Sequence, residues 1–483
     1  MALTDVRRAL DAIRRLERAT RAVAPESRDA LARRWAELPD HVRSDAQTLG
    51  RMAVGCEGTH GVFPRCNFTC TPCYHSADAN RVRVDGAHTV AEVERQMALA
   101  RAIRGPHAHA QLIGGEVTLL DADDHAAALE VMRRHGREPM SFTHGDFDYE
   151  YLERLALGPD GGPRVRRLSF AGHFDTTMRG RRGLRRVADE AELNPYRQRF
   201  CDMFRRLHAE HGVRFFLAHN VTVTPANVDS IPQIVRDVRT MGFAMCSFQP
   251  AAFVGDDRRW REDYSSLDAD VIWSKIGEGA GATLPFRIVQ TGDERCNRSA
   301  FGYFVGGRWF PVFEEGDHAD LATRDAFFTY LGGVHWGAPA PLLAARLARV
   351  LLRRPALAGT ALAWLVRRVR RAGGALVVLR ALRRRELVPM TFVMHRFMHA
   401  DDVRPAWELL ERGETSEDPR VKETQERLRS CFYAMAHPES GRLVPACVQH
   451  CLLDPEENAR LAVELPLPRV RTRAAAPGGP GAG

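Results

Sequence analysis

The chain has 483 residues, roughly two to three times a typical domain, so we expect more than one packed core. Its 45% hydrophobic, 27% charged and 8% aromatic residues are typical of a globular protein and exclude disorder over most of the length. The N-terminal residues carry charge every few positions, which argues against a secretory signal peptide. Ten cysteines without such a signal favour metal binding or thiol chemistry over a disulfide framework.

The net charge of +8 comes from one segment. Residues 326–385 contain 12 arginines and no aspartate, glutamate or lysine, and the other residues carry 57 basic against 61 acidic side chains. A nucleic-acid-binding protein would spread its basic side chains over a binding face, and no nucleic-acid motif is present. We therefore expect no nucleic acid partner.

Two sections of the chain differ in their apolar periodicity. Residues 1–55 read as a helical N-terminal extension, because apolar side chains recur there every three to four positions. Across residues 56–255, strands alternate with helices of ten to fifteen residues, which predicts a parallel sheet or a βα barrel. The expected strands include residues 110–113, 140–143, 168–171, 215–224 and 243–248.

Four further segments follow the alternating section. Residues 256–325 form a post-barrel segment of mixed pattern, and residues 326–385 read as an Arg-rich amphipathic helical segment. Residues 386–468 read as a compact C-terminal domain, and the composition of residues 469–483 predicts a disordered tail. Several glycines and prolines near the start of the Arg-rich segment argue against a membrane-spanning helix there.

Three cysteines lie close together in the string Cys66-Asn-Phe-Thr-Cys70-Thr-Pro-Cys73-Tyr74-His75. Composition alone predicts about 0.004 matches to this C-x3-C-x2-C spacing in such a chain, so chance explains it poorly. Three thiolates on a short loop can bind one side of a metal centre. Zinc could take them with His75 as fourth ligand, and an iron–sulfur cluster could take them and leave one iron open to an outside ligand.

This cysteine loop resembles that of the radical S-adenosylmethionine superfamily, which follows the first barrel strand and holds a four-iron cluster. About forty residues later, Gly114-Gly115-Glu116 is similar to the family's Gly-Gly-Glu motif at the end of the second strand. Two positions depart from the family pattern. Pro72 stands where an aromatic residue is usual, and Val117 stands where proline is common. Neither departure removes a ligand.

The resemblance covers residues 56–255 and implies a partial parallel (β/α)6 barrel of radical S-adenosylmethionine type. It implies one-electron reduction of S-adenosylmethionine, which releases methionine and a 5′-deoxyadenosyl radical that takes a hydrogen atom from a substrate. Side chains at the carboxyl ends of barrel strands carry function in such folds. The implied residues are Cys66, Cys70 and Cys73 for a [4Fe-4S] cluster, and Gly114, Gly115, Glu116, Asp175, Asn220 and Thr222 for S-adenosylmethionine.

Four later cysteines form a second candidate site. Cys431, a hairpin turn, and then Cys447 and Cys451 look like the hairpin of the SPASM and twitch auxiliary-cluster domains. Cys296, from the post-barrel segment, is the expected fourth thiolate. The resemblance implies at most one auxiliary [4Fe-4S] cluster, and the alternative is cysteines scattered through a helical domain.

The resemblance also leads to expectations about the substrate, the partners and the cellular location. We expect an unidentified small-molecule substrate, a lipid or polyprenoid being one candidate and a peptide another, and an electron donor such as a flavodoxin or ferredoxin. A zinc-stabilised binding protein without turnover is the alternative from another class. The Arg-rich segment sets an apolar stripe beside arginines, which suits a helix in a membrane interface or a helix packed on an acidic body. We expect a cytoplasmic protein with peripheral contact to a membrane surface.

Overall fold

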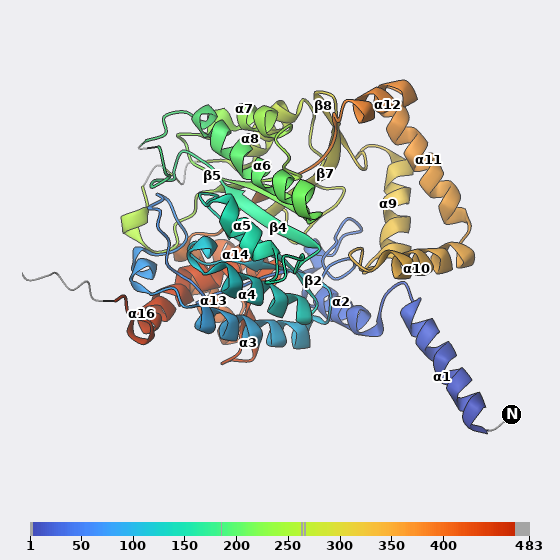
Figure 1. Ribbon diagram of the computed structural model, residues 1–483, viewed down its shortest axis with the longest axis horizontal. Coiled ribbons are helices and arrows are strands. Elements are labelled where there is room, and N and C mark those ends of the chain that lie inside the picture. Colours follow the sequence, from blue (N-terminus) through green and yellow to red (C-terminus); the bar gives the residue numbers. More distant parts are fainter. Residues whose placement is uncertain (1–2, 185, 262–263, 265–266, 469–483) are drawn as a thin grey trace, which may run out of the picture.

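The structure is a computed structural model that describes residues 3–184, 186–261, 264 and 267–468 (Figure 1). Its strands form one 11-stranded sheet in the order β11-β10-β1-β2-β3-β4-β5-β6-β9-β7-β8. The expected disordered tail, residues 469–483, lies outside the described part of the chain. None of the described helices combines the length and the apolar character needed to cross a membrane.

Strands β1 to β6 follow one another in chain order, each parallel to the next. Their bounds are Cys56–Gly58 (β1), Ala108–Leu112 (β2), Arg137–Thr143 (β3), Arg167–His173 (β4), Arg214–Val223 (β5) and Met245–Pro250 (β6). The helices between them are Gly86–Arg104 (α3), Ala122–Arg134 (α4), Tyr149–Ala156 (α5), Asn194–His211 (α6) and Ile231–Val238 (α7). The predicted partial (β/α)6 barrel is confirmed.

The core of the barrel lies between the sheet and this layer of helices. On α6, Phe200 and Phe204 are fully buried and contact Phe170 of β4 and Phe243 at the entry to β6. The helix begins at Asn194-Pro195, where proline is pre-set for the first turn, and ends before Gly212, whose φ is 69°. The residues at its two ends therefore set the bounds of α6, and the stripe of phenylalanines sets the face that it buries.

Strands from the C-terminal half extend the sheet at both ends. β9 (Leu387–His395) pairs parallel to β6, followed by antiparallel β7 (Asn297–Val305) and β8 (Arg308–Pro311). At the other end β10 (Tyr433–His437) pairs parallel to β1, and β11 (Arg442–Pro445) closes a hairpin with it. The domain boundaries expected at residues 255 and 386 stay predictions. Strands from both sides of each boundary belong to the same sheet.

The remaining helices lie outside the barrel. The N-terminal residues form α1 (Leu3–Ala19) and α2 (Pro25–Glu37), and α1 projects from the body in Figure 1. The Arg-rich segment forms α10 (Ala340–Arg353), α11 (Ala356–Arg371) and α12 (Ala375–Arg383), which follow α9 (His318–Leu331). These four helices stand beside the barrel like a bracket (Figure 1). The others are α8 (Ala269–Ala280), α13 (Ala400–Glu411), α14 (Pro419–Arg429), α15 (Ala446–Val448) and α16 (Asp454–Glu464).

A buried ion pair fastens the last helix to the first strand. Just after β1, His60 Nδ1 lies 2.8 Å from Glu457 Oε1 of α16, and its Nε2 lies 2.9 Å from the Ala436 carbonyl oxygen of β10. Burial works to lower the pKa of His60, but the hydrogen bond and the charge of Glu457 outweigh it and hold this pKa above the usual range. The protonated ring can donate to both acceptors at once.

The Glu457→Gln variant tests this ion pair through its pH dependence. A raised folded-state pKa contributes stability that is complete below the ordinary histidine value and is lost as pH rises through the folded-state value. We expect the variant to lose about 1–3 kcal/mol near pH 6 and clearly less near pH 9. Thermal unfolding of both proteins across this range gives the difference. An equal loss at both pH values would contradict a charged pair.

Candidate functional site

The three clustered cysteines line a cavity at the carboxyl ends of the barrel strands. Cys66, Cys70 and Cys73 lie on the loop between β1 and α3. Gly114, Gly115 and Glu116 line it from just after β2, and further walls come from the carboxyl ends of β3, β4, β5 and β6. Segments far apart in the sequence therefore place their strand ends around one space, as a parallel barrel requires.

The glycines after β2 allow the cysteine loop to lie against them. A Cβ on Gly115 would come within 2.0 Å of the Arg65 carbonyl oxygen, and one on Gly114 would meet Phe63 at 2.7 Å. In this close packing the Gly115 amide donates to the Phe63 carbonyl at 2.8 Å, and the Glu116 amide donates to the Arg65 carbonyl at 2.9 Å. The motif thus fixes the position of the residues that lead into Cys66.

The carboxylate of Glu116 is held by donors of this chain. Its Oε1 accepts from the Thr118 amide at 3.1 Å and from the Thr118 and Thr143 hydroxyls at 2.6 Å each. Its Oε2 accepts from the His144 amide at 2.8 Å. Glu116 is 1% exposed, so these bonds replace its hydration and join the ends of β2 and β3. A contact between this motif and an ammonium group stays a prediction.

His144, the first residue after β3, contacts Asn67 and Phe68 of the cysteine loop. Its Nδ1 accepts from the Asp146 amide at 3.0 Å, so Nε2 carries the proton and donates to Asn67 Oδ1 at 2.8 Å. The ring stacks on Phe68 with centroids 3.9 Å apart. Burial lowers the pKa of His144, which keeps the ring neutral in this position.

The three other residues predicted to contact S-adenosylmethionine, Asp175, Asn220 and Thr222, differ in their position relative to the cavity. Thr222 of β5 lines the cavity, and so does His173 of β4. Asp175 is fully buried, and it accepts from His173 Nε2 at 2.6 Å and from the Thr222 and Thr177 amides at 2.8 Å each. Asn220 is buried on β5 and is not part of the cavity wall. The roles of all three toward a cofactor stay predictions.

The cavity also contains a cation that sequence reasoning missed. Arg259, in the run after β6, is 8% exposed, and its side chain makes no ion pair or hydrogen bond with the described residues. Burial raises the pKa of the Cys66 thiol to about 12 and that of Cys70 well above its usual value, so without a metal these thiols are protonated. A guanidinium facing buried thiols favours an anionic occupant. The only sequence signal was the basic run Arg258-Arg259 among acidic residues.

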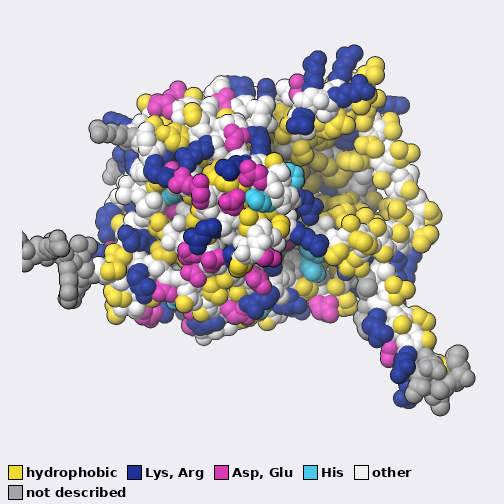
Figure 2. All heavy atoms as spheres, viewed as in Figure 1, with side chains coloured by type: hydrophobic (Ala, Val, Ile, Leu, Met, Phe, Trp, Pro, Cys, Tyr) yellow, Lys and Arg dark blue, Asp and Glu magenta, His cyan; other side chains and the backbone are white. Residues whose placement is uncertain are grey.

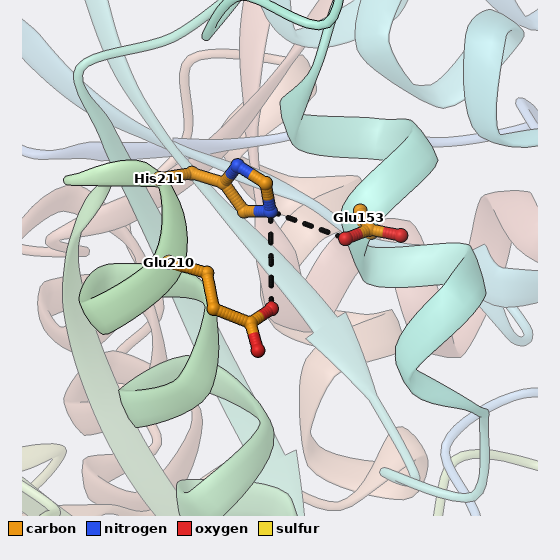
Figure 3. A group of neighbouring side chains, drawn as sticks. All are labelled: Glu153, Glu210 and His211. Carbon is orange, nitrogen blue, oxygen red and sulfur yellow. Dashed lines mark hydrogen bonds and ion pairs between the residues drawn. The ribbon is translucent and has the colours of Figure 1, made fainter.

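A single metal ion needs tighter geometry than the cysteine loop offers. Zinc bonds of about 2.3 Å to sulfur bring the ligand atoms within about 4 Å of one another. Among the described residues, the set whose ligand atoms all lie within 4.8 Å is Glu153, Glu210 and His211, on α5 and α6 (Figure 3). The three thiols and His75 do not meet that spacing. In this structure the loop thiols and His75 are therefore not arranged as a single-zinc site.

The Glu153, Glu210 and His211 group is an ion-pair network of the surface. His211 Nε2 lies 3.1 Å from Glu153 Oε1 and 3.9 Å from Glu210 Oε2 (Figure 3). Glu210 also accepts from the Tyr149 hydroxyl at 2.7 Å and from Arg206 Nε at 2.9 Å. Because a guanidinium already neutralises one carboxylate, this group is a poor cation site.

The four later cysteines converge although 155 positions separate the first from the last. Cys296 precedes β7, Cys431 precedes β10, and Cys447 and Cys451 lie in the helical segment after β11, Cys447 on α15 and Cys451 in the π-helix that follows it. Cys431, Cys451 and Cys296 all lie close enough to Cys447 to act on the charge of its thiolate. Arg427 Nε donates to Cys296 Sγ at 3.2 Å, and burial raises the pKa of all four thiols. That they hold a second cluster stays a prediction.

No family model and no curated protein matches this chain in sequence. Among solved structures, it is similar to Streptococcus suis SuiB bound to S-adenosylmethionine, at 13% identity and a TM-score of 0.28 over 41% of each chain. It is also similar to anSMEcpe with bound AdoMet and the Cp18Cys peptide, at 16% identity and a TM-score of 0.31 over 46% of this chain and 56% of that one. The alignments thus span 41% and 56% of the lengths of those two structures.

The Gly115→Ala variant tests the close approach of the cysteine loop. The new methyl group would displace the Arg65 backbone, so we expect a loss of about 2 kcal/mol or more and impaired iron loading. Gly359→Ala is the matched control, because a Cβ at that position on α11 meets nothing within 4 Å and alanine favours a helix. Thermal unfolding and iron content of both variants give the answer. Normal iron content in Gly115→Ala would refute this role.

Proposed function

We propose that this protein is a radical S-adenosylmethionine enzyme that acts at the cavity of the cysteine loop. The observation that carries the proposal is that Cys66, Cys70 and Cys73 share one cavity with Gly114 and Gly115. The cysteine loop and the Gly-Gly-Glu motif were identified separately in the sequence, and they adjoin at the ends of β1 and β2 of a parallel barrel. The loop thiols and His75 do not have the spacing of a single-zinc site, and we propose a cluster of several irons there.

The residues around the cavity fit a [4Fe-4S] cluster and S-adenosylmethionine. The three loop thiols would hold the cluster, and the close packing of Gly114 and Gly115 against Phe63 and Arg65 holds the loop at the end of β2. When bound, these groups supply one-electron cleavage of S-adenosylmethionine to methionine and a 5′-deoxyadenosyl radical. The unpaired Arg259 offsets the negative charge that three thiolates bring into the cavity. His144 and its partners Asn67 and Phe68 hold the loop in place.

The substrate and the electron source belong to the same proposal. We favour a lipid or polyprenoid substrate, because helices with exposed leucines and arginines flank the barrel. A peptide is the alternative, and two similar structures were solved with peptides, anSMEcpe with Cp18Cys and SuiB with the precursor peptide SuiA. An electron donor such as a flavodoxin or ferredoxin would reduce the cluster, and we place the protein in the cytoplasm at the surface of a membrane.

Substitution of the loop cysteines tests the proposed chemistry. Two thiolates cannot hold a cluster and leave one iron open, so Cys66→Ala, Cys70→Ala and Cys73→Ala should each abolish reductive cleavage. The measurement is formation of 5′-deoxyadenosine by anaerobically purified protein with dithionite as reductant. Cys201→Ala, a cysteine in the barrel core, is the control and should retain activity.

Two outcomes would contradict the proposed enzyme. Cleavage at the wild-type rate in any of the three loop variants would exclude the loop as the ligand set. A colourless wild-type protein with stoichiometric zinc and no acid-labile sulfide would identify the zinc-stabilised binding protein instead.

The iron content of combined variants tests the proposed auxiliary site. If Cys296, Cys431, Cys447 and Cys451 hold a second cluster, the reconstituted protein carries about eight irons, four in each cluster. The triple variant of the loop cysteines should then retain about half of the iron. Adding Cys447→Ala and Cys451→Ala to that triple variant should remove the rest. A loop triple variant that already binds no iron would assign these four cysteines to packing alone.

A further inference from the structure

Helix α11 turns its charged side toward the protein. Trp364 Nε1 donates to the Val312 carbonyl at 2.9 Å, and Arg368 Nη1 donates to the Pro311 carbonyl at 2.9 Å. Arg367 and Arg368 also pair with the fully buried carboxylate of Asp320 on α9. Trp364, Arg367 and Arg368 share one face of the helix, and this face is anchored to α9 and to the end of β8.

The opposite face of α11 is apolar and open to solvent. Leu362 is 62% exposed, Leu365 is 51% exposed and Val366 is 39% exposed, and their spacing places them on one stripe. A surface helix ordinarily does the reverse, with leucines inward and arginines outward. The fixed position of Asp320 holds α11 in this inverted orientation.

Helix α12 continues the apolar surface. Leu376, Leu379 and Leu382 recur every three residues and are 70%, 42% and 58% exposed. The inward face carries Val378 and Ala381, which pack with a small cluster around β7 and β9. Figure 2 shows hydrophobic side chains gathered over the bracket of helices where it borders a hollow beside the barrel, with basic side chains projecting near α12.

Unpaired cations border these leucines. Arg370, Arg380, Arg383, Arg384 and Arg385 are exposed and make no ion pair with any residue that the structure describes. The arginines of α11 that do have acidic partners are Arg367, Arg368 and Arg371, and their shared partner Asp320 lies outside the Arg-rich segment. Exposed leucines and arginines without an ion-pair partner among the described residues therefore lie together along α11 and α12.

We propose that α11 and α12 form a docking surface for membranes that contain anionic lipids. The docking surface consists of Leu362, Leu365, Leu376, Leu379 and Leu382 with Arg370, Arg380, Arg383, Arg384 and Arg385. The leucines enter the boundary between headgroups and acyl chains, and the arginines contact lipid phosphates.

The charges favour a lipid surface over other occupants. A second copy of the chain, paired symmetrically, would bring the same unpaired arginines against one another. A nucleic acid would pair with the arginines but leave the leucines in water. An anionic bilayer satisfies both kinds of side chain, because it presents phosphate and hydrocarbon at adjacent depths.

Sedimentation with vesicles tests the proposal on the full, anaerobically purified protein. The vesicles are phosphatidylcholine alone and phosphatidylcholine with phosphatidylglycerol, each at low and at high salt. We expect binding to the anionic vesicles that weakens with salt, and little binding to the neutral ones. A triple variant with glutamine at Leu362, Leu365 and Leu376 should lose about tenfold or more in the partition coefficient.

The second variant addresses the charges. Arg380→Gln, Arg383→Gln and Arg384→Gln together should weaken binding to anionic vesicles on the order of a hundredfold at low salt. The matched controls change three exposed apolar side chains or three exposed arginines elsewhere on the surface, and both should stay within about twofold of the wild type. They replace Val271, Val463 and Leu119 by glutamine in one protein, and Arg166, Arg186 and Arg236 by glutamine in the other.

Three outcomes would overturn the docking surface. The first is negligible binding of the wild type to both kinds of vesicle. The second is an equal loss of binding in the docking-surface variants and in their controls. The third is a dimer in sedimentation velocity that the leucine variant dissociates while no vesicle binding is seen, which would make this face an interface between copies.

Discussion

The close approach of two backbones at the ends of β1 and β2 governs the candidate site. Because Gly114 and Gly115 lack side chains, the segment Phe63–Arg65 can lie against them and accept two amide hydrogen bonds. Those bonds fix where the chain turns into Cys66. A side chain at either glycine would force the loop away from the strand end, and the three thiols would no longer share one cavity with the residues of β2.

Several acidic residues at the strand ends serve the scaffold. Glu116 joins the ends of β2 and β3, and Asp175 joins the end of β4 to Thr222 of β5. Each carboxylate is buried and surrounded by donors of the same chain, which is the condition for keeping a charge inside a protein. Glu116 and Thr222 also line the cavity, beside the thiols, the glycine backbone and Arg259, which has no ion pair with the described residues. The same carboxylates that tie the strand ends together therefore also shape the wall of the site.

In the Arg-rich helices too, a buried carboxylate is paired with donors of the same chain, and here this pairing leaves leucines exposed. The buried carboxylate of Asp320, with Asp317 and Glu314 beside it, pairs with the arginines of α11 on the inward side, so the helix shows its leucines to the outside. The arginines beyond its reach, at the end of α11 and on α12, remain without acidic partners in the described chain. A membrane surface offers both a hydrocarbon layer and negative charge, and so it complements what this packing leaves exposed.

The sequence by itself determined the features that depend on local pattern. The alternation of strands and helices across residues 56–255 predicted the barrel, because each βα unit repeats a short-range pattern. The spacing of the three cysteines and of Gly114-Gly115-Glu116 predicted where the candidate site lies, because strand ends in a parallel barrel meet at one edge.

Only the tertiary structure decided the features that depend on distant partners. Pairing of β9 with β6 and of β10 with β1 joins segments more than a hundred residues apart, and no local pattern encodes it. The sequence of the Arg-rich segment predicted an apolar stripe beside arginines, but the position of Asp320 decided which face of α11 turns inward. In the same way, the saturation of Glu116 and the isolation of Arg259 became visible only once their neighbours from other strands were in place. The partners of these charges come from distant parts of the chain, so the spacing of residues along the sequence does not predict them.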